Sequence, residues 1–279
     1  MIVYLNNHVT FYLFFNFIFS YLFFEVESFV PLGRIAHTAI TVDNKLYFFG
    51  GVDINRYDTT EVFYLDLTKP FDAVAPSWND ISASSAIPFR SAWAAVTLTN
   101  DSNNPTIYLI GGTTHNETGE DSFTSLVHTF NPNSGRWDIP KIEGDESKRR
   151  RHIQAVTNDF ENIYIFGGAA DGLVGSETVQ YFNDMIMLNT NDLTWSYGPI
   201  FNAPLRRHSY TATLSDGMIV YIGGIEITVD NITRDVDINQ INIYDMKLSS
   251  WSVVVRVYIS LLLQIFFMKF NLLFNYLIY

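Results

Sequence analysis

The chain has 279 residues, of which 48% are apolar and 16% aromatic, so it can bury a large core and is not expected to be disordered. Its formal net charge of -12 argues against nucleic-acid binding, which requires Lys and Arg to neutralise backbone phosphates. The chain contains no cysteine, which excludes disulfides, thiolate metal sites and cysteine nucleophiles, and leaves the redox compartment undetermined.

Residues 1–28 are predicted to be a signal peptide or an N-terminal hydrophobic anchor. Residues 11–24 form an uncharged run of 14 residues, a length that fits the apolar region of a signal peptide better than a membrane span. Val26 and Ser28 occupy the two positions that a signal peptidase inspects, which places cleavage before Phe29. The segment before the run has no Lys or Arg, so an uncleaved anchor is the alternative.

The following part of the chain is organised by a short apolar run closed by two glycines, which occurs four times. Each run alternates or is wholly apolar, and it ends in residues that tolerate positive φ, so it predicts a strand with a tight turn at its end. The first glycines of the pairs lie 61, 56 and 56 residues apart, and repetition at such a period indicates a repeat architecture. The pairs are Gly50 and Gly51, Gly111 and Gly112, Gly167 and Gly168, and Gly223 and Gly224.

Further positions recur when the copies are aligned on these glycines. Three copies have an Arg shortly before a His, and the second copy has an Arg before a Trp; these are Arg34 and His37, Arg90 and Trp93, Arg149 and His152, and Arg206 and His208. A polar loop and an apolar strand ending in Asp or Asn follow the glycines. A single Trp comes 27, 25, 27 and 27 residues after the second glycine, as Trp78, Trp137, Trp195 and Trp251.

This pattern resembles the kelch repeat, in which Arg and His lie on the first strand, Gly-Gly closes the second and Trp opens the fourth. The resemblance implies an all-β, kelch-type β-propeller built of four-stranded blades. We expect one propeller domain at residues 29–255, with four recognisable blades at about 29–86, 87–142, 143–200 and 201–255. The recurring Arg, His, Gly and Trp residues are interpreted as structural repeat positions.

The number of repeats predicts an incomplete ring. Kelch proteins usually close with six or seven blades, whereas four whole blades fit between Arg34 and Trp251. An open arc of blades would leave an apolar face uncovered at each end, which favours association. A closed four-bladed ring is the alternative.

Three potential N-glycosylation sites, Asn100, Asn116 and Asn231, fall in predicted loops. Together with residues 1–28 they favour the secretory pathway, with the protein extracellular or membrane-anchored. Residues 256–279 are again apolar and are interrupted by polar residues such as Lys269. This tail is interpreted as a marginal transmembrane segment or as translated AT-rich non-coding sequence.

The loops that follow the glycine pairs, at residues 52–60, 113–125, 169–183 and 225–239, are polar, acidic and mutually dissimilar. In a propeller such loops emerge together on one face, so we expect recognition there. The sequence therefore predicts a non-enzymatic platform that binds a protein or a glycan through its blade loops. Membrane attachment would depend on the terminal hydrophobic segments.

No catalytic, cofactor-binding or metal-ligating residue is assigned. We expect blade symmetry to hold His37, His152 and His208 apart, so that each bonds backbone at a blade junction together with its Arg. The resemblance also implies an alternative, because galactose oxidase is a kelch-type propeller whose copper site needs a Tyr crosslinked to a Cys. That cofactor cannot form without cysteine, which leaves a galactose oxidase-type carbohydrate oxidase, or an inactive relative, as the second interpretation.

Overall fold

The computed structural model describes residues 29–70, 72, 74–99, 104–116, 118–120 and 125–255. Contacts divide the chain into one unit at Met1–Val30 and a second at Pro31–Tyr279. The interpretations of residues 1–28, residues 256–279 and Asn100 lie outside the described residues. Within the described residues, no helix is long and apolar enough to cross a membrane.

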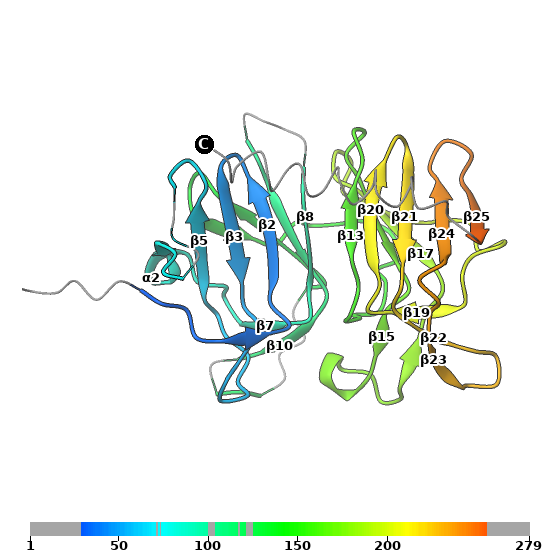
Figure 1. The fold of residues 1–279 in the computed structure, drawn as a ribbon, viewed down its shortest axis with the longest axis horizontal. Coiled ribbons are helices and arrows are strands. Elements are labelled where there is room, and N and C mark those ends of the chain that lie inside the picture. The colour runs from blue at the N-terminus through cyan, green and yellow to red at the C-terminus, as the bar shows by residue number, and fades with distance from the viewer. Residues whose placement is uncertain are drawn as a thin grey trace, which may run out of the picture. The chain divides into compact units, whose positions relative to one another are not determined.

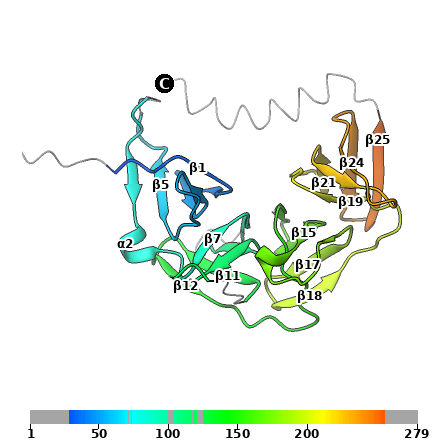
Figure 2. The ribbon, with the colours of Figure 1, turned by 90° about the horizontal axis from the view of Figure 1, so that it is seen from below.

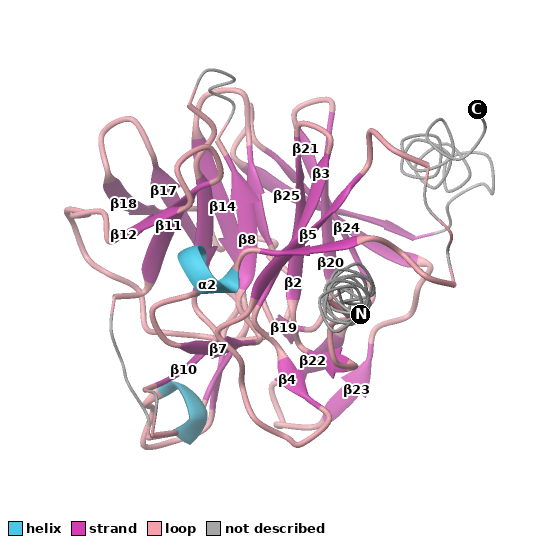
Figure 3. Ribbon diagram, turned by 90° about the vertical axis from the view of Figure 1, so that its left-hand side faces the viewer, coloured by secondary structure: helices cyan, strands magenta, loops and turns pink. Residues whose placement is uncertain are grey.

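Four four-stranded antiparallel sheets make up most of the second unit (Figure 1), which confirms the predicted all-β fold. Each sheet takes its strands in chain order, so each is an antiparallel meander (Figure 3). The first blade contains β2 (Thr38–Val42), β3 (Lys45–Phe49), β5 (Val62–Asp66) and β6 (Trp78–Asp80), and the second contains β8 (Ala95–Leu98), β9 (Ile107–Ile110), β11 (Val127–Asn131) and β12 (Arg136–Asp138). The third contains β13 (Ala155–Thr157), β14 (Asn162–Phe166), β17 (Met185–Asn189) and β18 (Thr194–Tyr197), and the fourth contains β20 (Thr211–Ser215), β21 (Met218–Ile222), β24 (Gln240–Asp245) and β25 (Ser250–Val255).

Small sheets at one end of the blades form a surface that we call the loop face. Three of the four pair a segment that enters a blade with the segment that follows its glycine pair, and the one in blade three pairs two segments that both follow the glycine pair, so the predicted loops partly form strands. They are β1 (Arg34–Ile35) with β4 (Val52–Asp53), β7 (Arg90–Ala92) with β10 (Thr113–His115), β15 (Ala169–Ala170) with β16 (Gln180–Tyr181), and β19 (Arg206–His208) with β22 (Ile225–Ile227) and β23 (Thr233–Asp235). In the third blade the entering segment makes a single bridge, Arg151 to Ala169. Two single-turn helices, α2 (Ser82–Ser85) and η1 (Gly172–Val174), complete the elements.

The hydrophobic core consists of three clusters, one between each pair of successive blades. Successive side chains of the strand before each glycine pair face opposite sides of the sheet, so they pack against different neighbouring blades. In β14, Ile165 packs toward blade two and Phe166 packs toward blade four. The first strands β2, β8, β13 and β20 contact one another in this order, and Figure 2 shows the blades side by side in chain order.

Three of the four recurring tryptophans lie at blade boundaries. The Trp137 indole N–H donates to the Ser85 carbonyl at 2.9 Å, and that of Trp251 donates to the Pro199 carbonyl at 3.0 Å. Both acceptors lie in the segment that leads into the blade carrying the Trp. Trp195 is buried between blades two and three, and Trp78 packs edge-on against Phe63.

The glycine pairs form the blade junctions. The second glycine of a pair donates its N–H to a carbonyl on the next blade: Gly51 to Ser91 at 2.8 Å, Gly112 to Arg150 at 2.9 Å, and Gly168 to Arg207 at 2.8 Å. A Cβ atom on the first glycine would clash with the same carbonyl oxygen, and the first glycines have φ of 58° to 70°. Both the close approach and the left-handed backbone therefore require glycine.

A second series of main-chain bonds links successive blades beside these junctions. The N–H of Trp93 donates to Ala36 at 2.8 Å, that of His152 to Trp93 at 3.4 Å, and that of Ser209 to His152 at 2.9 Å. All four residues have left-handed φ, between 57° and 61°. They are therefore equivalent positions of the four blades.

This register corrects the alignment that the spacing of Arg and His suggests. Arg34 is equivalent to Ser91, Arg150 and Arg207, because these residues all come two positions before the left-handed one. Arg90, Arg149 and Arg206 lie one position earlier. Matching by residue type therefore placed Arg34 one residue out of register with the other three, because blade two has Ser91 at the equivalent position and blades three and four have successive arginines. The backbone hydrogen bonds define the register.

Gly167→Val is expected to destabilise the fold. The new side chain would adopt a left-handed backbone, which costs about 1–2 kcal/mol, and would also meet the Arg207 carbonyl. The melting temperature should fall by more than about 4 °C. Gly172→Ala is the matched control, because no described atom lies within 4 Å of its added Cβ and its φ is not positive. Equal melting temperatures for the two variants would contradict the proposed junction.

Candidate functional site

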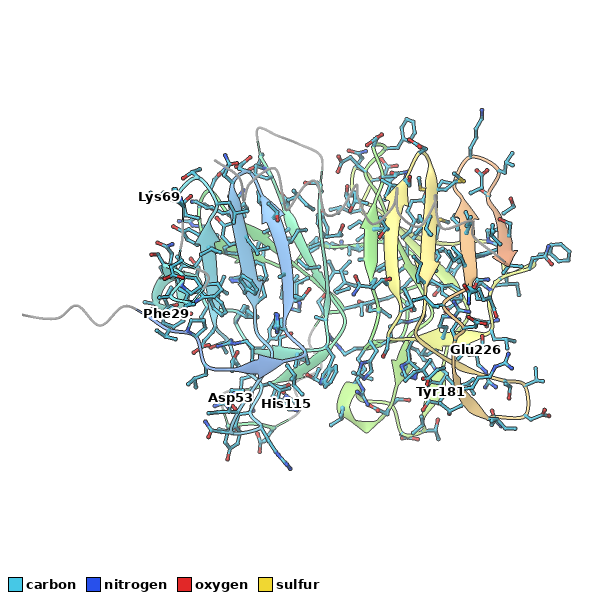
Figure 4. All side chains as sticks on the ribbon, viewed as in Figure 1. Phe29, Asp53, Lys69, His115, Tyr181 and Glu226 are labelled. Carbon is cyan, nitrogen blue, oxygen red and sulfur yellow. The ribbon has the colours of Figure 1, made fainter. Side chains whose placement is uncertain are left out.

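Four half-buried rings from three blades form a continuous line on the loop face. The ring centroids of Trp93 and His152 lie 4.4 Å apart, those of His152 and His208 lie 5.6 Å apart, and those of His208 and Tyr181 lie 5.5 Å apart. The last two rings are stacked. We call Trp93, His152, His208, Tyr181 and the adjoining Arg151 the ring cluster. Figure 4 shows Tyr181 at the loop-face end of the blades.

The backbone explains why these side chains converge. Trp93 and His152 occupy the left-handed position of blades two and three, which costs about 1 kcal/mol or more for each residue and is offset by the bond between their main chains. His208 comes one position earlier in blade four, at the end of β19. Tyr181 ends β16, whose next residue Phe182 accepts the N–H of Arg207 at 3.1 Å.

Arg151 is the cation of the ring cluster, and Asp171 is its partner. The Arg151 Nε donates to Asp171 Oδ1 at 3.3 Å, and its Nη2 makes a second, shorter bond to Oδ2. The guanidinium also contacts the His152 imidazole and lies 5.9 Å from the centroid of the Trp93 ring, over its face. Burial alone would raise the pKa of Asp171, but the Arg151 hydrogen bond and charge hold that pKa below its ordinary value.

The two histidines are neutral at pH 7. Burial, together with the charges of Arg151 and His208, lowers the pKa of His152 to about 4, while Asp171 opposes the shift. Burial and Arg151 also lower the pKa of His208. The ring cluster therefore presents uncharged aromatic surface beside one paired guanidinium.

A shallow groove of about 460 Å³ adjoins the ring cluster between blades three and four. Tyr181 belongs to both. At the groove, the Arg206 Nη2 donates hydrogen bonds to the Thr228 carbonyl at 2.7 Å and to Asn231 Oδ1 at 3.0 Å. The groove is lined by Val179, Gln180, Tyr181, Phe182, Arg206, Ile227, Asn231 and Thr233.

Exposed apolar side chains occur along the loop-face segments. The β22–β23 hairpin carries Val229 and Ile232 at 83% and 61% exposure, and Val179 beside the groove is 63% exposed. Other exposed members on these segments are Ile35, Ile54, Tyr57, Leu173 and Ile238. Side chains of this kind at a loop rim are typical of interaction surfaces.

Two of the arginines singled out in the sequence, Arg34 and Arg149, donate to backbone at a blade junction, as the interpretation of the repeat Arg and His residues expects. Arg34 Nη1 donates to the Gly50 carbonyl at 3.1 Å and pairs with Glu61, and Arg149 Nη1 donates to the Gly111 carbonyl at 3.1 Å. The histidine half of that interpretation is wrong for His152 and His208. The His152 ring contacts Arg151, the His208 ring contacts Ser209 Oγ, and both contact other rings. Both side chains lie beside the main-chain bonds of the blade junction and not within them.

The expectation that blade symmetry separates the histidines is also wrong for His152 and His208. They come at successive positions of the repeat, so they approach each other across the blade boundary. His37 comes at a third position and packs 5.8 Å from Phe48. Among the described residues, no group of three His, Cys, Asp or Glu side chains is arranged to hold a metal ion.

Sequence reasoning missed Arg151, Asp171 and Tyr181. Arg151 directly precedes His152 and could have been noticed as its neighbour, but Asp171 and Tyr181 lie in loops that do not align between blades.

A second missed contact joins blades one and two. Asp58 accepts from Thr113 Oγ1 at 2.6 Å and from His115 Nδ1 at 2.9 Å.

Two of the three potential glycosylation sites lie in the described part of the loop face. Asn231 is exposed, and its Oδ1 accepts from Arg206. Asn116 is half-buried, and its amide nitrogen, the atom that a glycan would modify, donates to Glu120 Oε2 at 3.0 Å. The two sites therefore differ in accessibility.

Comparison with known proteins agrees with this architecture. The sequence matches the Attractin/LZTR1 beta-propeller family over residues 6–266. The chain belongs to this family. Together with relatives that carry kelch names, the match confirms the kelch-repeat β-propeller predicted from the sequence.

Three curated relatives illustrate the range of similar proteins. Human Kelch domain-containing protein 3 is 23% identical over 231 residues, covering 78% of this chain and 56% of the relative. Host cell factor of Drosophila melanogaster is 22% identical, over 80% of this chain and 15% of the relative. N-(sulfonatooxy)prop-2-enimidothioate sulfolyase of Thlaspi arvense is 20% identical, over 80% of this chain and 62% of the relative. The chain thus spans just over half the length of the Kelch domain-containing protein that it matches.

His152→Asn is expected to flatten the pH dependence of stability. The folded-state pKa of His152 is about 4 against an ordinary value of 6.5, so the unfolded chain binds a proton that the folded chain does not. The free energy of unfolding should therefore fall as pH falls from about 6.5 to about 4. Urea denaturation at several pH values should show a shallower fall in the variant than in the wild type. Parallel curves would mean that folding does not lower the pKa of His152.

Proposed function

We propose that the chain is a non-enzymatic binding module that recognises a partner protein at the ring cluster and the adjoining groove. The observation that carries this proposal is the convergence of Trp93, His152, His208 and Tyr181 from three blades onto one stretch of the loop face. Rings held in place by backbone junctions lose little entropy on binding. The kelch propeller fold is itself consistent with a protein-binding platform.

The composition of the surface favours a protein over a glycan as the partner. Tyr, Trp and Arg are the side chains that most often dominate binding energy in protein interfaces. Here they adjoin exposed Val179, Val229 and Ile232, which a polar sugar would leave uncovered. Both imidazoles are neutral at pH 7, so their desolvation by a partner costs less than that of charged groups.

An enzymatic role is the second candidate, since one relative bears the name of a sulfolyase. A galactose oxidase-type activity would need a Tyr–Cys cofactor, and the chain has no cysteine. Copper binding with peroxide release from galactose or another primary alcohol by the purified protein would overturn the non-enzymatic proposal.

Selection from a phage-displayed peptide library on the immobilised full chain tests the binding site. Trp93→Ala and Tyr181→Ala should each weaken binding of the selected peptides by at least about tenfold, the effect expected of an aromatic anchor. Both variants should keep the wild-type melting temperature to within a few degrees.

The control for this experiment is Lys69→Ala at the other end of the blades (Figure 4), which should leave peptide binding unchanged. Lys69 is exposed and makes only a 3.6 Å surface ion pair with Asp66, so its removal should not disturb the fold. Peptides that bind Trp93→Ala and Tyr181→Ala as well as they bind the wild type would place recognition elsewhere.

We also propose that the protein enters the secretory pathway, on the basis of residues 1–28 and the loop-face glycosylation sites. Expression in a eukaryotic host followed by glycosidase digestion should lower its apparent mass. Asn231 should contribute more than Asn116, because it is exposed while the Asn116 amide is engaged by Glu120. Thr233→Ala, which removes the acceptor motif but keeps Asn231, should abolish that contribution. A mass that glycosidase leaves unchanged would contradict the proposal.

A further inference from the structure

The groove beside the ring cluster contains both ends of a potential N-glycosylation motif. Asn231, the residue that would carry the glycan, and Thr233, the third residue of the motif, both line the groove. Both residues are exposed. Asn116, the other potential acceptor in the described part of the chain, does not belong to the lining. A modification motif is therefore part of the wall of this groove.

The turn that carries Asn231 fixes its backbone. This turn joins β22 to β23, and the Asn231 N–H donates to the Thr228 carbonyl at 3.0 Å. The Thr228 N–H donates to the Ile232 carbonyl at 2.9 Å, and the Ile232 N–H donates to Thr228 Oγ1 at 3.1 Å. Asn231 has a left-handed φ of 60°, a conformation that Asn adopts more often than most residues. Backbone contacts therefore set the direction in which the Asn231 side chain leaves the turn.

Arg206 fixes the orientation of the Asn231 amide. Its Nη2 donates to Asn231 Oδ1 at 3.0 Å and to the Thr228 carbonyl at 2.7 Å. Oδ1 thus faces the Arg206 guanidinium, which itself lines the groove. The Asn231 Nδ2 donates to no residue that the structure describes, so a sugar attached there breaks no described contact.

The geometry of an amide decides on which side the sugar lies. An N-substituted amide is planar and strongly prefers the trans form, in which the substituent on nitrogen lies opposite Cβ and on the same side as the oxygen. A sugar on Asn231 Nδ2 therefore leaves on the side of Oδ1, next to Arg206 and the groove. The groove volume of about 460 Å³ lies in the range of pockets that hold drug-sized molecules, so it can accommodate the first sugar ring.

We propose that an N-linked glycan on Asn231 occupies the groove and closes it to a protein partner, so that modification of this residue controls recognition. The inference rests on the proposed function, because it requires a partner that uses the groove beside Tyr181. The sugar hydroxyls can accept from Arg206 Nε and Nη1, which donate to no described residue. A glycan is bulky and hydrophilic, so it excludes the side chains of a partner from the space that it fills.

The position of the glycan can be measured without any partner. The full chain is expressed in a eukaryotic host, and its labelling by hydroxyl radicals is compared with that of Thr233→Ser, which keeps the acceptor motif, and Thr233→Ala, which removes it. Labelling of Tyr181 and Val179 should be lower in the wild type and in Thr233→Ser than in Thr233→Ala. Tyr57, an exposed residue of the blade-one loop, should be labelled equally in all three chains.

Two outcomes of this measurement overturn the inference and leave the proposed function intact. One is equal labelling of Tyr181 and Val179 in all three chains. The other is a wild-type chain that carries no glycan on Asn231.

Peptides selected from the phage-displayed library on the Thr233→Ala chain test the control of recognition. They should bind the glycosylated wild type and Thr233→Ser at least about tenfold more weakly than Thr233→Ala, because the glycan fills part of their site. Trimming the glycan to its first sugar should not restore binding, since that sugar lies in the groove. Thr118→Ala, which removes the Asn116 motif, should bind the peptides as weakly as the wild type.

Equal peptide binding by the wild type and Thr233→Ala overturns the inference, as does full recovery of binding after trimming. Peptides that bind Tyr181→Ala and Trp93→Ala as well as they bind the parent chain overturn the proposed function, and control of recognition at this groove fails with it.

Discussion

One carbonyl oxygen held between two glycines joins each blade to the next, and the rest of the propeller depends on this contact. Ser91, Arg150 and Arg207 supply the carbonyls, and the second glycine of the preceding blade donates to each. The contact brings two backbones closer than any side chain would permit, which sets the spacing at which the aromatic faces of neighbouring sheets interlock. Buried arginines at the same positions reinforce it: Arg150 donates to the Gly167 carbonyl at 2.8 Å and pairs with Asp184.

The same junction organises the loop face. Each junction holds a blade by a carbonyl that comes two residues before the left-handed position of that blade. The side chains at the left-handed position and beside it therefore come together across blade boundaries. Trp93, His152 and His208 meet in this way, although they occupy three blades. A rigid scaffold thus supports recognition residues that lie in otherwise dissimilar segments. The backbone strain at Trp93 and His152 is tolerated because both residues take part in the inter-blade hydrogen bonds.

The fold was predictable from the sequence because its determinants are local and repeated. Gly-Gly at near-constant spacing and the following Trp report the second and fourth strands of every blade, and both signals survive where the intervening loops differ. The register of the segment entering each blade was not predictable from residue type. Arg149, Arg150 and Arg151 are identical in the sequence, and only hydrogen bonds to Gly111, Gly167 and Asp171 distinguish them.

The candidate site was predictable only in its general location. Dissimilar loops indicated the face on which the candidate site lies, but Tyr181 and Asp171 belong to no repeat, so their approach to His208 and Arg151 depends on tertiary structure. The expectation that blade symmetry separates the histidines failed for the same reason. His152 and His208 lie one residue apart in the repeat register, and this difference makes their side chains neighbours.

Amide hydrogen exchange of the second glycines tests the junction most directly. If a carbonyl of the following blade accepts their N–H groups, Gly51, Gly112 and Gly168 should exchange as slowly as the central strands of their blades. Fast exchange at Gly51, Gly112 and Gly168, at a rate like that of the β20–β21 turn residue Gly217, would contradict this account of how the blades are joined.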